Sequence, residues 1–240
     1  METVLSADGL TKTYGTCKAL DGQSIELGRG QVIGILGPNG AGKTTMIECM
    51  LGTKKADSGK TTILGLDPVK DRKKLFEKVG VQFQEASYPN KIRTDELCET
   101  TAALYRKPAD YRVLLKQFSL EDKKKAEVSS LSGGERQKLF IVLALIPDPQ
   151  IVFLDELTTG LDPRARKNVW GFLKELKQRG LTIVMTSHFM DEVEELCDQI
   201  LILREGRRVF QGTVKEAVSS SPFDDFEESY LWYTEEEEES

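Results

Sequence analysis

The chain has 240 residues and a formal net charge of −6, from 33 Lys and Arg against 39 Asp and Glu. With 39% hydrophobic and 30% charged residues it has the composition of a folded globular protein, which excludes intrinsic disorder for most of its length. The longest apolar run, from Leu139 to Ile146, has eight residues, whereas a membrane-spanning helix needs about 20, so we expect no membrane span.

Cysteine and histidine usage narrows the possible chemistry. The four cysteines are at least 32 residues apart, which excludes a disulfide framework and a CxxC metal site and predicts buried, reduced thiols. His188 is the only histidine, so any site that needs two imidazoles is excluded. The start, Met1-Glu2-Thr3, lacks the basic and then apolar pattern of a secretory signal, so we expect the chain to stay in the cytoplasm.

The N-terminal part is predicted to contain two kinds of strand. Val4 to Gly30, with turns at Tyr14-Gly15 and Gly28-Arg29-Gly30, is expected to form short antiparallel strands that pack on the core. Gln31 to Leu36 is short, nearly all apolar and followed by glycine, which is typical of a strand buried on both faces of a parallel sheet.

The loop after this strand has the spacing GxxxxGK[ST], in the run Gly37-Pro38-Asn39-Gly40-Ala41-Gly42-Lys43-Thr44-Thr45. Glycines let successive backbone N–H groups face inward at the positive end of the helix that follows, which makes an anion-binding loop. Lys43 supplies a positive charge for the β- and γ-phosphates, and the Thr44 hydroxyl is a hard oxygen ligand for Mg²⁺. The spacing therefore predicts nucleotide binding.

The second half of the chain alternates strands and helices. Residues 151–154 and 181–186 repeat the buried-strand pattern, and Asp162 and Pro163 open a helix between them that Gly180 ends. This βαβ order predicts an α/β core. Glu85 to Ser130, before it, is rich in helix formers and charge, and we expect a helical insert there.

A pair of carboxylates follows the strand at 151–154. Asp155 lies at its carboxyl end, where parallel sheets bind ligands, so it is expected to hold Mg²⁺, and Glu156 is expected to polarise the attacking water. The alternative is that the pair is only a polar helix cap.

The run Leu131-Ser132-Gly133-Gly134-Glu135-Arg136-Gln137-Lys138 resembles the signature of the ATP-binding cassette (ABC) ATPases, usually LSGGQ. Ser132 and the two glycines expose backbone N–H groups and a hydroxyl at a helix start, which again suits an anion. The helix is expected to continue through Leu139 to Ile146 and to stop before Pro147.

Other positions follow the order of motifs in that family. Tyr14 matches the aromatic residue that stacks on adenine, Gln84 the Q-loop, Asp162 the D-loop, and His188 the switch histidine. Tyr14 could also be an ordinary turn aromatic, and the choice of Gln84 over Gln82 depends on the family's motif. The resemblance extends to about residue 215 and implies a P-loop (RecA-like) core, an N-terminal antiparallel β subdomain and a helical subdomain inserted at about 85–130.

The resemblance also implies a site composed of two subunits. In the family two cassettes pair head to tail, so that Ser132, Gly133 and Gly134 of one subunit close over the γ-phosphate of the ATP held by Lys43 of the other. Asp162 would also lie at the nucleotide.

Hydrolysis would depend on three further residues. Glu156 would be the general base, His188 would hold the γ-phosphate and the water, and Gln84 would sense Mg²⁺ and link the site to a partner. Glu135 and Leu157 replace the usual Gln and Pro of the family, but neither removes a group that hydrolysis requires, so we expect an active ATPase.

The resemblance implies the cytoplasmic motor of a transporter whose permease is a separate chain, with the motor peripheral on the cytoplasmic face of the cell membrane. Gly80 to Glu99 and the helical insert look like the drug or antibiotic exporter (ABC-2 type) subgroup, although importers use the same motor. Two intact half-sites in one chain favour a homodimer over a heterodimer. The alternative is a soluble ABC ATPase of the cluster-assembly type. No sustained basic stripe is present, so no nucleic-acid partner is expected.

The C-terminal segment carries the acidity of the chain. Residues 219–240 hold nine acids and no Lys or Arg, which leaves 33 positive and 30 negative residues in the ATPase domain expected at 1–218. Repelling charges and little apolar area predict a disordered tail, with Tyr230-Leu231-Trp232-Tyr233 as a docking segment in the alternative interpretation.

Overall fold

The computed structural model describes residues 2–82, 88–156 and 158–235 of the chain. Its main sheet has six strands in the order β5-β6-β7-β3-β8-β9, all parallel except β9, which runs antiparallel to β8. These strands are β3 (Val32–Leu36), β5 (Val79–Gln82), β6 (Ile151–Leu154), β7 (Thr182–Thr186), β8 (Gln199–Arg204) and β9 (Arg207–Gly212). The predicted strands at 31–36, 151–154 and 181–186 are therefore confirmed.

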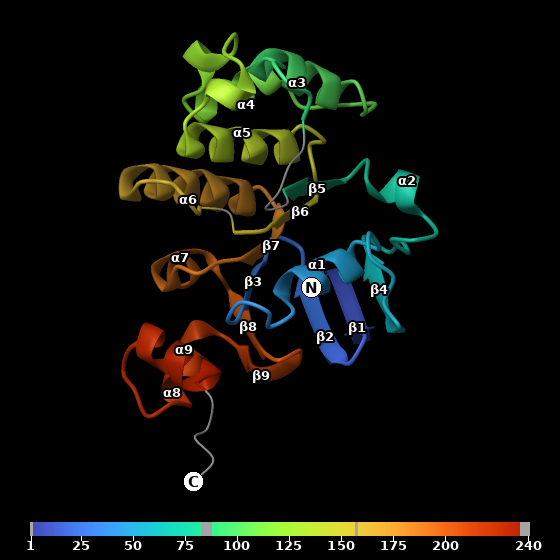
Figure 1. Ribbon diagram of the computed structural model, residues 1–240, viewed down its shortest axis with the longest axis vertical. Coiled ribbons are helices and arrows are strands. Elements are labelled where there is room, and N and C mark those ends of the chain that lie inside the picture. The colour runs from blue at the N-terminus through green and yellow to red at the C-terminus, as the bar shows by residue number, and fades with distance from the viewer. Residues whose placement is uncertain (1, 83–87, 157, 236–240) are drawn as a thin grey trace.

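A second, antiparallel sheet of three strands is formed by β1 (Thr3–Tyr14), β2 (Cys17–Gly28) and β4 (Ser58–Ile63), in the order β2-β1-β4. The prediction of antiparallel strands before the core is confirmed, but β1 and β2 have 12 residues each and are not short. Helix α1 (Lys43–Met50) lies between the two sheets (Figure 1), and its apolar side chains share one core cluster with both.

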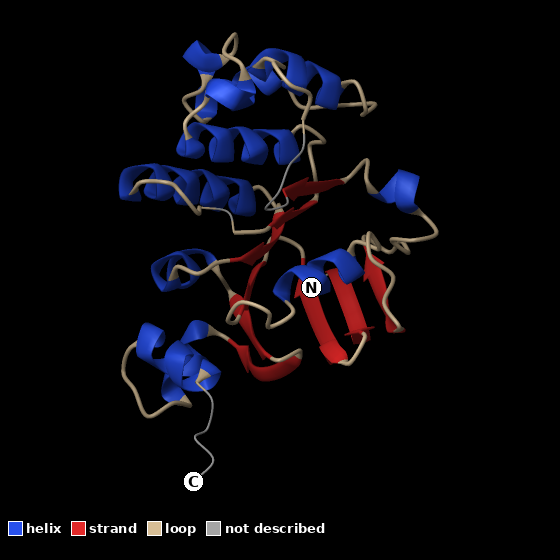
Figure 2. Ribbon diagram, viewed as in Figure 1, coloured by secondary structure: helices blue, strands red, loops and turns tan. Residues whose placement is uncertain are grey.

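The parallel strands are apolar because both of their faces are covered. In β6, Ile151 and Phe153 pack in the cluster with α1, whereas Val152 and Leu154 pack in a cluster with the helices on the opposite side. Figure 2 shows the strands of this sheet, in red, with helices on both sides of it. This alternation explains a continuous apolar run in place of a period of two.

Most of the helical residues of the second cluster come from α3 (Thr94–Ala102), α4 (Tyr111–Gln117), α5 (Gly133–Leu145) and α6 (Pro163–Gln178). Two short 3-10 helices, Glu121–Lys123 and Val128–Ser130, lie between α4 and α5. As predicted, α5 ends before Pro147, and α6 begins after Asp162, whose carboxylate accepts hydrogen bonds from the N–H groups of Arg164 and Ala165.

The remaining helices are α2 (Arg72–Leu75), α7 (Met190–Leu196), α8 (Val214–Ser219) and α9 (Phe226–Thr234). No helix within the described ranges is both long and apolar enough to cross a bilayer. Cys49 and Cys98 are buried, but Cys17 is exposed in β2, so the expectation of buried thiols is wrong for Cys17.

Helix α9 corrects the prediction of a disordered tail for residues 226–234, while residues 236–240 of the predicted tail lie outside the described residues. Phe226 is 1% exposed and packs in a cluster with Leu36 of β3 and Ile202 of β8. Asp225 caps the helix by accepting hydrogen bonds from the N–H groups of Glu227 and Glu228. Within these residues the prediction fails because Asp225 caps the helix and Glu227 and Glu228 face solvent, while Phe226 reaches the core.

Candidate nucleotide-binding site

The P-loop connects β3 to α1 and places Lys43 at its centre. Gly42 is the N-cap of α1 with φ of +105°, and a Cβ there would lie 2.3 Å from the carbonyl oxygen of Ala19, so only glycine fits. The Lys43 ammonium donates hydrogen bonds to the carbonyls of Gly37, at 2.8 Å, and Pro38, at 3.0 Å. The loop therefore fixes a buried positive charge at the start of a helix.

Two nearby carboxylates stabilise the charged form of Lys43. Burial lowers the pKa of Lys43, and the carboxylates of Glu156 and Asp155 oppose that fall. The two acids thus lie on the same side of the sheet as the loop, at the carboxyl ends of the parallel strands.

Asp155 connects three elements at this edge. It is 2% exposed and accepts hydrogen bonds from the hydroxyl of Thr44 in α1, at 3.2 Å, and from that of Thr186 in β7, at 2.5 Å. A carboxylate and a hydroxyl are hard oxygen donors, which is the set that Mg²⁺ prefers. The pair Asp155 and Thr44 therefore fits this metal ion.

Glu156 and His188 form a second pair beside the first. The Oε1 atom of Glu156 lies 3.0 Å from Nε2 of His188, in the turn after β7. The backbone N–H of Glu156 donates to the Thr186 hydroxyl at 2.8 Å, and Glu156 has a left-handed backbone with φ of +52°. An acid that can accept a proton thus faces an imidazole at the open edge of the sheet.

Sequence reasoning missed Thr186, Gln137 and the contact of Gln82. Thr186 links Asp155 to the backbone of Glu156, Gln82 Nε2 donates to the carbonyl of Asp155 at 3.2 Å, and Gln137 Nε2 donates to the carbonyl of Glu156 at 3.3 Å. Gln82 and Thr186 could have been found from the sequence as candidates, because each is a polar residue at the end of a buried strand.

The signature residues form the start of α5. Ser132 is the N-cap and exchanges hydrogen bonds with Glu135, whose carboxylate accepts the Ser132 N–H at 2.9 Å and pairs with Lys123 at 3.1 Å. The Ser132 N–H and the Lys123 ammonium lower the pKa of Glu135. The negative charge that replaces the family's usual Gln is therefore used in a capping box and countered by a lysine.

The structure brings Lys43, Thr44, Asp155, Glu156 and His188 together, but not every predicted site residue. The side-chain hydrogen bonds of Ser132 and Asp162 lie within the first turns of α5 and α6.

Two nucleotide contacts were predicted at the periphery. Tyr14, at the end of β1, is 42% exposed, and the ammonium groups of Lys12 and Lys54 lie 5.5 and 5.3 Å from its ring centroid. Gln84 lies outside the described residues.

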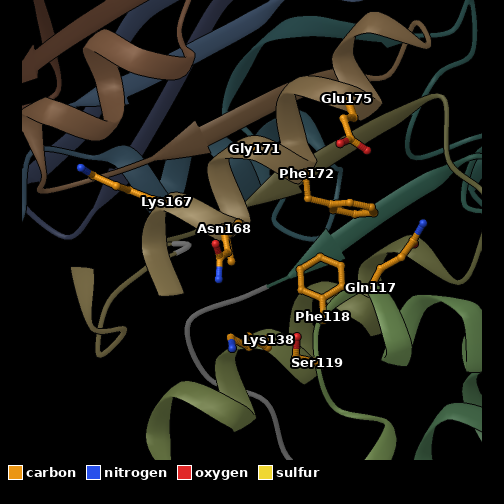
Figure 3. Close-up of a pocket in the computed structure, with 10 residues that line it drawn as sticks. Gln117, Phe118, Ser119, Lys138, Lys167, Asn168, Gly171, Phe172 and Glu175 are labelled. Carbon is orange, nitrogen blue, oxygen red and sulfur yellow. The ribbon is translucent and has the colours of Figure 1, made fainter. Parts of the chain in front are cut away.

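A cavity of about 470 Å³ lies elsewhere, between the end of α4, α5 and α6 (Figure 3). Phe118 and Phe172 meet edge to face in its wall, with ring centroids 4.7 Å apart, and Lys138 also lines it. Its lining shares no residue with the P-loop or with the acids at the strand ends. It is therefore separate from the candidate site.

The chain is similar to a known protein family. The model of the family described as ABC transporter matches residues 20–159. The chain belongs to the ABC transporter family. Members of the family bind and hydrolyse ATP, so the chain is an ATP-binding subunit with ATPase activity.

Relatives of this ABC subunit include ATP-binding proteins named for resistance and for export. It is 36% identical over 220 residues to the daunorubicin resistance ATP-binding protein DrrA3 of Streptomyces coeruleorubidus, covering 90% of this chain and 70% of that protein. It is 38% identical over 221 residues to the Nod factor export ATP-binding protein I of Ralstonia nicotianae, covering 90% of this chain and 69% of that protein.

A solved structure confirms the predicted fold. The ATP-binding subunit of an ABC transporter matches 97% of this chain and 100% of its own, with a TM-score of 0.88 at 24% identity. The P-loop α/β core and the antiparallel sheet beside it are thus those of an ABC ATPase.

Proposed function

We propose that this ABC ATPase powers an exporter. Two copies bind ATP and Mg²⁺ between them, head to tail, and drive a separate membrane permease from the cytoplasmic face of the membrane. The observation on which this depends most is the Glu156–His188 pair, 3.0 Å apart, beside Asp155 and Lys43. A nucleotide sensor without hydrolysis would not need such a pair.

The residues at the strand ends would divide the chemistry of hydrolysis. The N–H groups of the loop and the Lys43 ammonium bind the phosphates, while Thr44, Asp155 and Gln84 hold Mg²⁺. The ion, when bound, supplies positive charge to the β- and γ-phosphate oxygens. Glu156 accepts the proton of the attacking water, and His188 orients Glu156 and the γ-phosphate.

The partner subunit would complete each site. Ser132, Gly133 and Gly134 lie at the start of α5, where backbone N–H groups favour an anion, and the Glu135 charge is countered by Lys123. These features support a contact to the γ-phosphate on the facing subunit. Asp162 would join this interface, and Tyr14 would stack on adenine.

The role in export is supported by the names of the two relatives, one a daunorubicin resistance protein and the other a Nod factor export protein. We assign residues 1–218 to the ATPase domain, with the helical subdomain inserted at about 85–130. The permease would select the transported substrate.

Glu156→Gln tests the proposal, because an amide cannot accept the proton of water. We expect phosphate release from MgATP to fall by about 10²-fold or more, and ATP to hold the variant as a dimer in gel filtration. Glu194→Gln makes the same change at an exposed carboxylate of α7 and should leave the rate unaltered.

Undiminished phosphate release by Glu156→Gln would refute the assignment of the base. A monomer under trapping conditions would refute the head-to-tail dimer alone. Recovery of the native protein from a cytosolic fraction, without membrane protein bound, would instead favour the assembly-factor alternative.

A further inference from the structure

A buried carboxylate that the proposed reaction does not use lies beneath the turn that carries His188. Glu192, in α7, is 0% exposed. Its Oε1 accepts a hydrogen bond from the indole N–H of Trp170 at 2.8 Å, and its Oε2 accepts one from the hydroxyl of Ser187 at 2.5 Å. A buried carboxylate is costly unless it is hydrogen-bonded, and here each oxygen has its own donor.

The Ser187 hydroxyl organises the residues on both sides of His188. While it donates to Glu192, it accepts a hydrogen bond from the N–H of Phe189 at 3.0 Å. Since β7 ends at Thr186 and α7 begins at Met190, the turn between them has three residues, Ser187, His188 and Phe189. The hydroxyl therefore links the first and last residues of the turn to each other and to Glu192.

Helix α6 supports the same turn at two points. Arg166 and Trp170 are four residues apart and thus lie on one face of the helix. Trp170 donates to Glu192, and the Arg166 guanidinium lies 4.3 Å from the ring centroid of Phe189. The neighbours of His188 are therefore held against α6 from two directions.

We propose that Glu192 is a positioning residue for His188. Through Ser187 on one side and Trp170 on the other, it fixes the turn so that the imidazole stays 3.0 Å from Glu156. This inference rests on the proposed role of His188 in hydrolysis. Without the link the turn can shift, which slows the chemical step but leaves ATP binding by the P-loop unaffected.

Ser187→Ala removes the link with the smallest change in volume. We expect kcat for phosphate release to fall about tenfold or more, with KM for ATP changed less than about twofold. Glu192→Gln keeps the size of the side chain but presents only one acceptor oxygen, and should give the same pattern. Tyr111→Phe is the matched control, because it removes a 2.6 Å hydrogen bond to Glu99 in the helical region and should leave kcat unchanged.

A double-mutant cycle separates positioning from a merely structural role. In a His188→Ala background, Ser187→Ala should lower kcat by less than about twofold further, because its effect passes through the imidazole. An equal decrease in both backgrounds, or full kcat in Ser187→Ala and Glu192→Gln, would overturn the role of Glu192. Full activity of His188→Ala itself would instead overturn the assignment of His188, and the inference with it.

Discussion

At the scale of single residues, Glu156 combines the side chain proposed as the general base with an unfavourable backbone conformation. Its φ of +52° lies in the left-handed region, which costs a residue other than glycine roughly 1 kcal/mol or more. Asparagine tolerates this region better. The proposed base therefore carries backbone strain. The hydrogen bond that its N–H donates to the Thr186 hydroxyl and the one that its carbonyl accepts from Gln137 must offset this strain.

We predict that Glu156→Asn abolishes phosphate release while the free energy of unfolding stays constant or rises by up to about 1 kcal/mol. Urea unfolding and a phosphate assay measure the two effects. Glu205, with φ of +49° in the turn between β8 and β9, is the matched control: Glu205→Asn should give the backbone gain without loss of activity. Destabilisation by Glu156→Asn alone would show that its side-chain contacts outweigh the strain.

The residues proposed to react could mostly be chosen from the sequence, but the residues that hydrogen-bond to them could not. Lys43, Thr44, Asp155 and Glu156 could be predicted because their motifs are local in the chain and follow buried strands. The role of Thr186 depends on β7 lying next to β6 in the sheet. That pairing belongs to the tertiary structure, so a local sequence motif does not indicate it. The same holds for Glu192, because its partners Trp170 and Ser187 come from separate elements.

At the scale of elements, helix α5 approaches strand β5 at Gly80. A Cβ on Gly80 would lie 2.0 Å from the backbone carbonyl oxygen of Ala144 in α5, and backbone cannot move aside as a flexible side chain can. Gly171, in the exposed middle of α6, has no atom within 4 Å of the corresponding position. Gly80 is therefore required for the packing of α5 on β5, whereas Gly171 only lowers the intrinsic stability of its helix.

Gly80→Ala should lower the free energy of unfolding by about 2 to 3 kcal/mol, because α5 must shift away from the sheet. Gly171→Ala should raise it by about 0.5 to 1 kcal/mol, because alanine favours helix more than glycine does. Urea unfolding of both variants checks the opposite signs. Similar shifts in one direction would contradict the close approach of α5 and β5.

At the scale of the whole molecule, the C-terminal helix packs on the edge of the sheet that leads into the nucleotide site. Its cluster includes Leu36, the last residue of β3 before the P-loop. Burial raises the pKa of Tyr230, and the backbone N–H of Gly37 opposes that rise, so this side chain lies against the start of the loop. The composition of the segment predicted disorder because it averages the acids with the few residues that contact the body.

Phe226→Ala tests how much the packing of α9 contributes to the free energy of unfolding. The side chain is 1% exposed, and removing a buried phenyl ring costs about 3 to 5 kcal/mol, so we expect a lower urea midpoint. Trp232, on the same helix, is 44% exposed, and Trp232→Ala should change the free energy of unfolding by less than about 1 kcal/mol. The matched pair tests orientation as well as order, because a helix docked by its other face would reverse the two results. An unchanged midpoint in Phe226→Ala would mean that the segment after Ser219 does not fold onto the body, as its charge pattern alone predicts.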